Sequence, residues 1–270
     1  FPYPPVSLLA AVPGQILGDV RIGHRAAIAL TAVLMLAVGR NGHRSRIGAA
    51  LFLTLPGSVF MTLGGWTEAF VAAALAGVIL AYRRRSAMTH FVFGLFLFMK
   101  QYGVLFVPLW SLVVDPDPAP VRDRVRRLVI GAMPWFLISI GFALWDVPAF
   151  VRSVITWQFV QPLRVDSLSV LVWFSQTFGE LPRLITLIAP VVVAVGSVAL
   201  VIRRCPPSPA GLAAAVAFVM MSFVLLSKQA FLNYYFLVVA AAALALSAET
   251  DTGDSPGHHG AVQTGASAAE

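Results

Sequence analysis

The stretch RLITLIAPVVVAVGSVALVI, residues 183–202, is followed directly by Arg203 and Arg204. A run of about 20 predominantly apolar residues is the length that an α-helix needs to cross the hydrocarbon core of a bilayer. Paired arginines at one end are typical of the cytoplasmic side, because cytoplasmic loops carry an excess of basic residues. This stretch therefore predicts a transmembrane helix whose C-terminal end faces the cytoplasm.

Similar apolar runs recur along the whole chain. Its 270 residues are 59% hydrophobic and 11% charged, with a mean hydropathy of +0.83. So few charged residues cannot cover the surface of a soluble globule of this size. The sequence predicts an integral membrane protein, an all-α polytopic bundle of transmembrane helices. About seven full spans are expected, at 24–39, 47–64, 66–82, 128–145, 183–202, 211–227 and 231–247.

Arginine clusters between these runs set the predicted topology, because the positive-inside bias places them in the cytoplasm. The net charge of +7 arises largely in this way. It does not indicate nucleic-acid binding, because no stripe of basic and aromatic residues accompanies it. Residues 1–23, 64–68, 146–182 and 227–235 are then outside, and the C-terminus is cytoplasmic. The clusters are Arg40, Arg44 and Arg46; Arg83, Arg84 and Arg85; Arg122, Arg124, Arg126 and Arg127; and Arg203 and Arg204.

The segment 88–114 has arginine clusters on both sides, so it must cross an even number of times. The simplest solution is a hairpin of two short helices, 88–99 and 103–114, which meet at Lys100-Gln101-Tyr102-Gly103. Each arm of about 12 residues rises only about 18 Å, short of the full hydrocarbon core. Lys100 is therefore predicted near the outer lipid boundary.

The remaining segments belong to one transmembrane domain, residues 1–247. Residues 1–23 are predicted to form the exit of an outer loop and a helix lying along the outer interface, because SLLAAVPGQILG is short and broken by proline. Asp19 and Arg21 are interpreted as structural residues at the end of that helix. Residues 146–182 form an outer loop, and the small, polar residues 248–270 form a disordered cytoplasmic tail. Cys205 is single, so neither an internal disulfide nor a cysteine metal site is available.

Polar residues collect on the predicted outer face, where ionisable groups at membrane depth are costly and are functional candidates. Both lysines of the chain, Lys100 and Lys228, lie there against the positive-inside bias. Two ammonium groups make suitable point-charge ligands for a phosphate. The candidate phosphate ligands are Lys100, Lys228 and Arg164, and the candidate pocket residues are Tyr3, Glu68, Gln101, Tyr102, Asp166, Asn233 and Tyr235.

Plainer interpretations stay open beside these. The lysines can snorkel to the interface, and Tyr234 and Tyr235 can belong to an aromatic belt. Arg164 and Asp166 can pair with each other in a solvated loop, and Glu68 can be an ordinary interfacial carboxylate. The sequence carries no dinucleotide, Walker, HExxH or nucleophile-elbow motif. It shows no convincing internal repeat, which disfavours an inverted-repeat transporter.

The order of four segments gives the chain a resemblance to a known family. They are FPYPPVSLLAAVPGQILGDVR (1–21), GGWTEAF (64–70), GLFLFMKQYGVLFVPLW (94–110) and LSKQAFLNYYFLV (226–238). Over most of residues 1–247 the chain resembles polytopic glycosyltransferases of the GT-C superfamily, nearest to the bacterial polyprenol-phosphate-mannose-type transferases. These enzymes use polyprenyl-phosphate sugars as donors and work at the outer membrane face.

The resemblance implies a mechanism. An aspartate in the first outer loop acts as general base on the acceptor hydroxyl, and the sugar leaves its phosphate through an oxocarbenium-like transition state. Cationic side chains neutralise the departing lipid phosphate. By analogy Lys100 and Lys228, with Arg164 as a weaker third, bind the donor phosphate, while Tyr3 and Tyr235 shape the sugar or lipid pocket. No cofactor is assigned, and a divalent cation is left open.

The family's aspartate precedes the YPP stretch, and Asp19 comes too late in the chain to take its place. The general base is therefore expected upstream of Phe1, with the 270 residues a C-terminal portion that is inactive by itself. The expected setting is a bacterial inner membrane with an extracytoplasmic active face. The expected acceptor is a glycolipid, polysaccharide or protein. The alternative is a lipid-linked sugar translocator or a polytopic assembly subunit without catalysis.

Overall fold

The chain folds into helices throughout residues 3–113 and 120–249, the part that the computed structural model describes. No strand occurs in these residues, so the predicted all-α class is confirmed. The predicted tail falls almost wholly outside the described residues, as do Phe1 and Pro2 of the first family-like segment. The helices are α1 (Pro5–Ile16), α2 (Val20–Val38), α3 (His43–Thr54), α4 (Pro56–Gly64), α5 (Glu68–Arg83), α6 (Thr89–Phe98), η1 (Gln101–Leu112), α7 (Val121–Trp145), α8 (Val147–Phe150), η2 (Val151–Thr156), α9 (Trp157–Val160), α10 (Val170–Phe178), α11 (Arg183–Arg204), α12 (Pro209–Leu225) and α13 (Leu232–Ala248).

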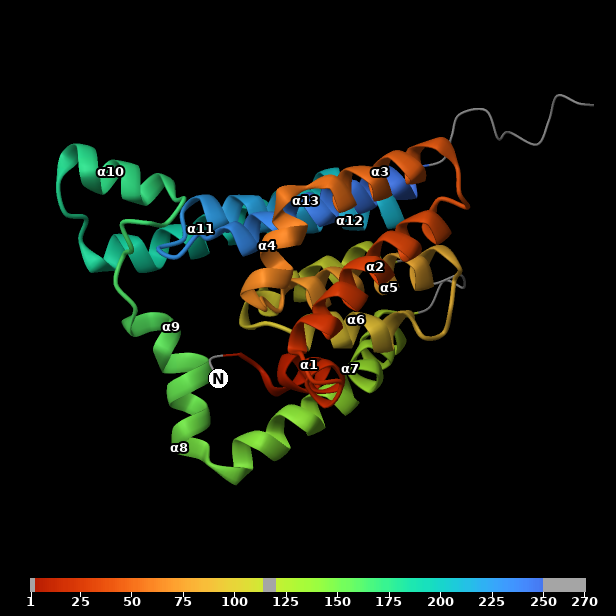
Figure 1. Cartoon of the computed structure of the whole chain (residues 1–270), viewed down its shortest axis with the longest axis horizontal. Helices are drawn as coiled ribbons and strands as arrows, with labels where there is room; N and C mark the ends of the chain where they lie inside the picture. Colours follow the sequence, from red (N-terminus) through yellow and green to blue (C-terminus); the bar gives the residue numbers. More distant parts are fainter. Residues whose placement is uncertain (1–2, 114–119, 250–270) are drawn as a thin grey trace, which may run out of the picture.

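The bundle is built around α5, α12 and α13 (Figure 1). The side chains of these three helices are buried along most of their lengths. Helix α3 packs on α13, α2 packs on α5, and α6 lies between α5 and α7. Small residues allow this close packing: a Cβ on Gly48 of α3 would lie 2.7 Å from the carbonyl oxygen of Ala243 on α13. By contrast, α7 has most of its apolar surface exposed, as suits a helix that faces lipid.

Three helices of the described chain are long and apolar enough to cross a membrane: α2, α7 and α11. A fourth candidate arises if α3 and α4, which are bent by 51° relative to each other, form one broken span. The membrane character is thus supported. Helices α12 and α13 each have 17 residues. Helix length and composition thus support three or four spans in the described residues, fewer than the seven that the sequence predicts.

The run 47–64 is two helices in the structure and not one straight span. Leu55 has an extended backbone, with φ −63° and ψ 131°, and Pro56 begins α4. Proline disfavours the helical conformation of the residue before it, which accounts for the break at Leu55. The hydroxyl of Ser58 donates a hydrogen bond of 2.8 Å to the Phe52 carbonyl, one of the groups that the break leaves without a helical partner.

The hairpin predicted at 88–114 is present, but its second arm differs in kind. The first arm is the α-helix α6, whereas the second, η1, is a 3₁₀ helix of 12 residues. Lys100 links them with an extended backbone, φ −145° and ψ 155°. Long 3₁₀ helices are uncommon because their hydrogen bonds have poorer geometry. The aromatic rings of Phe96 and Phe106, stacked with centroids 5.2 Å apart, hold the two arms together.

Gly103 lets the second arm return close to the first. A Cβ placed on it would lie 2.0 Å from the Leu97 carbonyl oxygen and 2.8 Å from the Leu97 carbonyl carbon, both of them backbone atoms that cannot turn aside. We expect Gly103→Ala to lower the free energy of unfolding by about 1–3 kcal/mol, the usual range for overpacking. Gly141→Ala is the matched control, because a Cβ there meets nothing within 4 Å. Equal unfolding midpoints of the two variants in detergent would contradict this contact.

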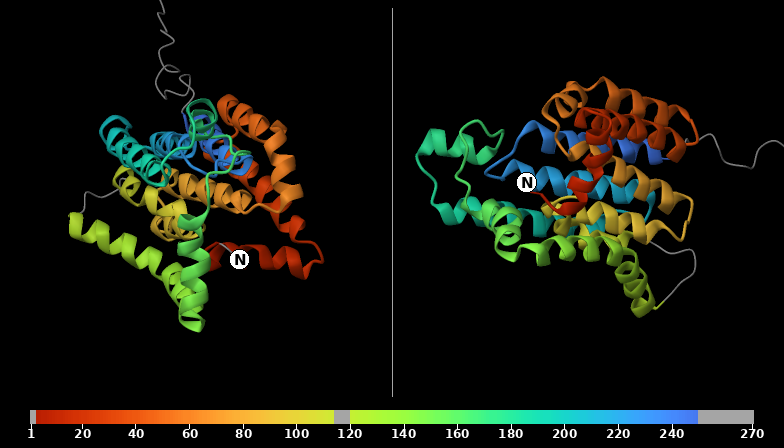
Figure 2. Two further views of the ribbon diagram at one scale, coloured as in Figure 1. Left: turned by 90° about the vertical axis from the view of Figure 1, so that its left-hand side faces the viewer. Right: turned by 60° about the horizontal axis from the view of Figure 1, so that its bottom comes forward.

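The segments expected at the outer face are largely helical. Helix α1 forms within residues 1–23, and α2 begins at Val20, four residues before the predicted span, where the Asp19 carboxylate accepts a hydrogen bond of 2.9 Å from the Arg21 amide. Residues 147–160 form one continuous helical arm, α8–η2–α9, which projects from the bundle (Figure 2). The arm, followed by α10, occupies the segment that was expected to be an outer loop.

Candidate functional site

A cavity of about 260 Å³ contains both lysines of the chain. It lies where the turn between α6 and η1, the end of the projecting arm, helix α11 and the turn between α12 and α13 meet. Lys100 and Lys228, 128 positions apart in the sequence, thus share one site. The lining residues are Tyr3, Lys100, Gln101, Tyr102, Val104, Leu105, Gln158, Phe159, Thr186, Leu187, Pro190, Val191, Phe223, Val224, Ser227, Lys228, Gln229 and Tyr234.

Lys100 is buried in an ion pair. Its Nζ atom lies 3.0 Å from Glu68 Oε1, and the two side chains are 1% and 0% exposed. Glu68 begins α5 directly after a turn in which Gly65 takes the left-handed conformation, φ 60°. The ring of Tyr3 covers the ammonium from the other side, with 3.4 Å between Nζ and the ring centroid. The carboxylate therefore compensates the charge of Lys100, and the lysine brings little net positive charge to the cavity.

Lys228 binds the end of the projecting arm. Its ammonium donates hydrogen bonds of 3.0 Å to the Phe159 carbonyl and 2.7 Å to the Gln161 carbonyl. Cations are favourable at the C-terminal end of a helix, where carbonyls lack helical partners. Burial lowers the pKa of the Lys228 ammonium, and the positive charge of Arg183 lowers it further. No carboxylate of the described residues forms an ion pair with Lys228, so its charge acts on the cavity uncompensated.

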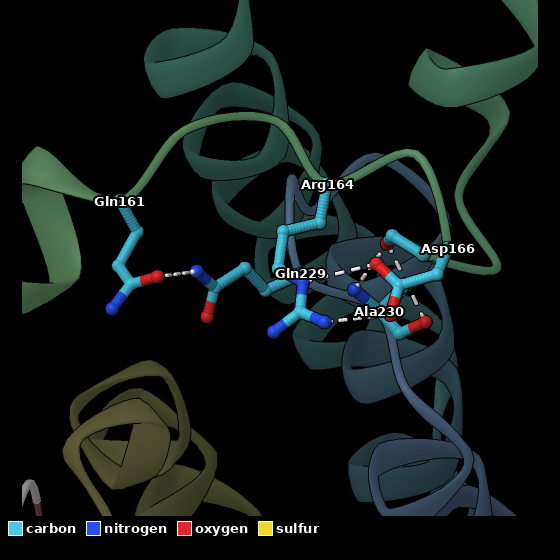
Figure 3. A network of polar contacts seen from close by, with 6 residues as sticks. Gln161, Arg164, Asp166, Gln229 and Ala230 are labelled. Atoms are coloured by element: carbon cyan, nitrogen blue, oxygen red, sulfur yellow. Dashed lines mark hydrogen bonds and ion pairs between the residues drawn. The ribbon is translucent and has the colours of Figure 1, made fainter.

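The segment 161–169, which follows the arm, is fixed to the turn that carries Lys228 (Figure 3). The Gln229 side chain donates a hydrogen bond of 2.5 Å to that of Gln161. The Leu168 amide donates one of 2.7 Å to the Ala230 carbonyl, and the Ala230 amide donates one of 2.6 Å to the Ser167 hydroxyl. These bonds set the position of the cavity wall formed by residues 158–161.

Arg164 and Asp166 do not line the cavity. They form a two-pronged ion pair, with contacts of 2.9 Å and 2.7 Å, and about half of each side chain is exposed (Figure 3). The hydrogen bonds from Arg164 hold the pKa of the Asp166 carboxyl below its usual value. The alternative that these two residues pair with each other in an exposed loop matches the structure, which places Arg164 apart from the two lysines' cavity.

Tyrosine hydroxyls line the polar part of the cavity, but they are not the expected set. Tyr3, Tyr102 and Tyr234 line it, whereas Tyr235 donates its hydroxyl hydrogen to the Leu168 carbonyl at 2.5 Å and lies outside. Burial raises the pKa of Tyr3 to about 12, and the Glu68 carboxylate acts in the same direction, so this hydroxyl stays protonated. The buried Tyr102 hydroxyl has no hydrogen-bond partner among the described residues.

Of three other expected pocket residues, one lines the cavity and two do not. The Gln101 side chain lines the cavity and donates a hydrogen bond of 3.4 Å to the Val154 carbonyl on the arm. Asn233 is buried in the first turn of α13 and does not line the cavity. Glu68 does not line the cavity, but its carboxylate pairs with Lys100, which does.

Part of the cavity wall is apolar. It consists of Leu187, Pro190 and Val191 on α11 with Phe223 and Val224 on α12. Helix α11 is one of the candidate spans. Other apolar side chains of α11, such as Leu184, Ile185 and Ile188, are exposed on the surface that would meet lipid. A cavity lined by cationic, hydroxyl and aliphatic groups together fits an amphiphile with an anionic polar head.

Sequence reasoning missed several polar lining residues: Gln158, Thr186, Ser227, Gln229 and Tyr234. Gln158 and Thr186 come from elements whose approach to the cavity depends on how the segment 146–182 folds back. Tyr234 is adjacent to Tyr235, which was chosen as the pocket residue in its place. In a helix, adjacent residues point about 100° apart, so a choice between them requires knowing which face of α13 meets the cavity.

No group of three or more histidine, cysteine, aspartate or glutamate side chains in the described residues has metal-binding geometry. Nor does any carboxylate of residues 3–113 and 120–249 line the cavity itself. The polar side chains that line the cavity carry ammonium, amide and hydroxyl groups.

Comparison of the chain with family models, curated proteins and solved structures gives no match.

Proposed function

We propose that the chain works as part of an integral membrane glycosyltransferase, which moves a mannose-like sugar from a polyprenyl-phosphate donor to an acceptor hydroxyl at the extracytoplasmic face of a bacterial inner membrane. The single observation that carries the proposal is the amphiphilic cavity shared by Lys100 and Lys228. The resemblance of residues 1–247 to polyprenyl-phosphate-dependent transferases supplies the reaction, and the cavity supplies a site of suitable chemistry.

We propose different roles for the two lysines, because only Lys100 is paired with a carboxylate. Lys228 provides the uncompensated positive charge for the donor phosphate, where an ionised hydrogen bond is about twice as strong as a neutral one. Lys100, neutralised by Glu68, holds the ring of Tyr3 at the cavity wall. The Tyr102 hydroxyl and the amides of Gln101 and Gln229 are neutral groups suited to sugar and phosphate oxygens.

Catalysis requires a base that the lining residues do not include, since no described carboxylate lines the cavity. The family resemblance assigns that base to an aspartate of the first outer loop. The same observation favours the second candidate, a lipid-linked sugar translocator, because a translocator needs a binding site without a base. Both candidates share the phosphate-bearing polyprenyl ligand.

Titration of the protein in nanodiscs with a short-chain polyprenyl-phosphate mannose tests the shared ligand, with the uncharged prenol of equal length as the matched control. We expect saturable binding of the phosphate lipid and weaker binding of the prenol. Equal binding of the two lipids would refute the phosphate site. Release of free polyprenyl phosphate in the presence of an acceptor supports the transferase, whereas movement of the intact lipid across proteoliposomes without cleavage supports the translocator.

A further inference from the structure

A second cavity, of about 420 Å³, lies at the bend between α3 and α4. It is distinct from the lysine cavity and shares no lining residue with it. Its walls come from the second and third turns of α2, the last turn of α3 and the length of α4. The lining residues are Arg25, Ile28, Ala29, Leu53, Ser58, Val59, Thr62 and Leu63.

The bend at Leu55 creates this groove. Figure 1 shows α4 turning away from the end of α3 towards α2 and α5, so that the chain crosses between two layers of the bundle. The two hydroxyl groups in the wall are turned back to the helix: Ser58 donates to the Phe52 carbonyl, and Thr62 donates to the Ser58 carbonyl at 3.2 Å. The wall is therefore apolar in practice, although its sequence contains hydroxyl residues.

The groove opens onto the surface where an apolar chain can enter. Leu53, Val59 and Leu63 are 49%, 60% and 58% exposed. Exposed aliphatic side chains flank a candidate transmembrane helix, α2, along the same surface. In a membrane protein such a surface meets the acyl chains of lipids and not water.

Arg25 is the one charged residue of the groove. It lies five residues inside α2, which corresponds to roughly 7–8 Å from the start of the helix. No acidic side chain of the described residues forms an ion pair with it. An unpaired arginine within a membrane-spanning helix is costly, and its long side chain relieves that cost by reaching polar headgroups at the interface.

We propose that this groove is a binding site for an anionic phospholipid, with one acyl chain along α4 and the phosphate headgroup on Arg25. The charge complementarity selects the headgroup, because the guanidinium can bind two phosphate oxygens at once. The apolar wall holds the chain and does not select among lipids. The site is independent of the donor proposal, since it uses other residues on other helices.

Native mass spectrometry of the detergent-solubilised protein, mixed with equal amounts of phosphatidylglycerol and phosphatidylcholine of identical chains, tests the proposal. We expect the wild-type protein to retain phosphatidylglycerol preferentially, by about fivefold for one basic side chain at an anionic headgroup. Arg25→Gln should remove that preference. Arg21→Gln, which changes an exposed arginine of the same helix that does not line the groove, should keep it.

A second variant separates the apolar wall from the charge. Val59→Trp fills the groove, so it should reduce retention of both lipids while leaving the unfolding midpoint close to that of the wild type. Three results would overturn the proposal: an unchanged preference in Arg25→Gln, an equal loss in Arg21→Gln, or a wild-type dimer in which Val59→Trp restores the monomer without affecting lipid retention. The last would make the groove an interface between two copies of the chain.

Discussion

Replacing Glu68 with alanine should lower the free energy of unfolding by about 3–5 kcal/mol, because it leaves the Lys100 ammonium buried without a counter-charge. Both side chains are excluded from solvent, with the Nζ and Oε1 atoms 3.0 Å apart. The pair also joins the start of α5 to the turn between α6 and η1, so its loss affects the packing of both elements. The measurement is reversible unfolding in detergent micelles, followed by helix content against denaturant.

The exposed pair offers a matched control. Asp166→Ala removes the carboxylate of the Arg164–Asp166 pair, in which both side chains remain in contact with solvent, so stability should stay close to that of the wild type. The double variant Glu68→Leu with Lys100→Met should recover most of the stability lost in Glu68→Ala, because apolar side chains of similar volume need no pairing. A Glu68→Ala protein as stable as Asp166→Ala would show that the pair is solvated.

The pairing of Lys100 also changes what the site can bind. Two free ammonium groups would suit a ligand with two negative charges, such as a diphosphate. One compensated and one uncompensated lysine suit a single phosphodiester charge, with hydroxyl and amide groups for the remaining oxygens. A donor with one phosphate between sugar and lipid therefore matches the charge of the cavity.

Much of the fold follows from local patterns that the sequence displays. Apolar runs between arginine clusters predicted the helical class and membrane character, and the flanking clusters of residues 88–114 predicted a hairpin that the structure contains. Pro56 also marks the break between α3 and α4, since proline disfavours the helical conformation of the residue before it. The run 47–64 was nevertheless predicted as one span, because its hydropathy is continuous. The 3₁₀ character of η1 depends on tertiary packing, which no local pattern reports.

The site was predictable only in part, for a different physical reason. The convergence of Lys100 and Lys228 followed from topology, because both were placed at the same membrane face. Which neighbours join them depends on helix rotation and on the path of residues 146–182, and these are fixed by long-range contacts such as Leu168 with Ala230. Topology assigns a residue to a face of the membrane but does not determine whether it points into a cavity, as Arg164 shows.

Replacing Lys228 with methionine should weaken binding of a polyprenyl-phosphate lipid by about 10- to 100-fold, the loss expected when a charged hydrogen-bond donor is removed. Methionine keeps much of the side-chain length, so the wall remains filled while the charge is lost. Lys228→Arg should recover part of the affinity, because it restores the charge with a different geometry. The measurement is a binding titration in nanodiscs with the phosphate lipid.

Arg164→Ala is the decisive comparison, because the sequence made both residues candidate phosphate ligands, Arg164 the weaker of the two, and only Lys228 lines the cavity. Among the described residues Arg164 is paired with Asp166 in the exposed loop, so its loss should leave the affinity unchanged. Lys228 also holds the Phe159 and Gln161 carbonyls, and Gln161→Ala separates that structural role, since it loosens the same wall without removing charge. If Gln161→Ala weakens binding as much as Lys228→Met does, Lys228 acts by positioning the arm; if Arg164→Ala does so, the phosphate lies in the loop and not in the cavity.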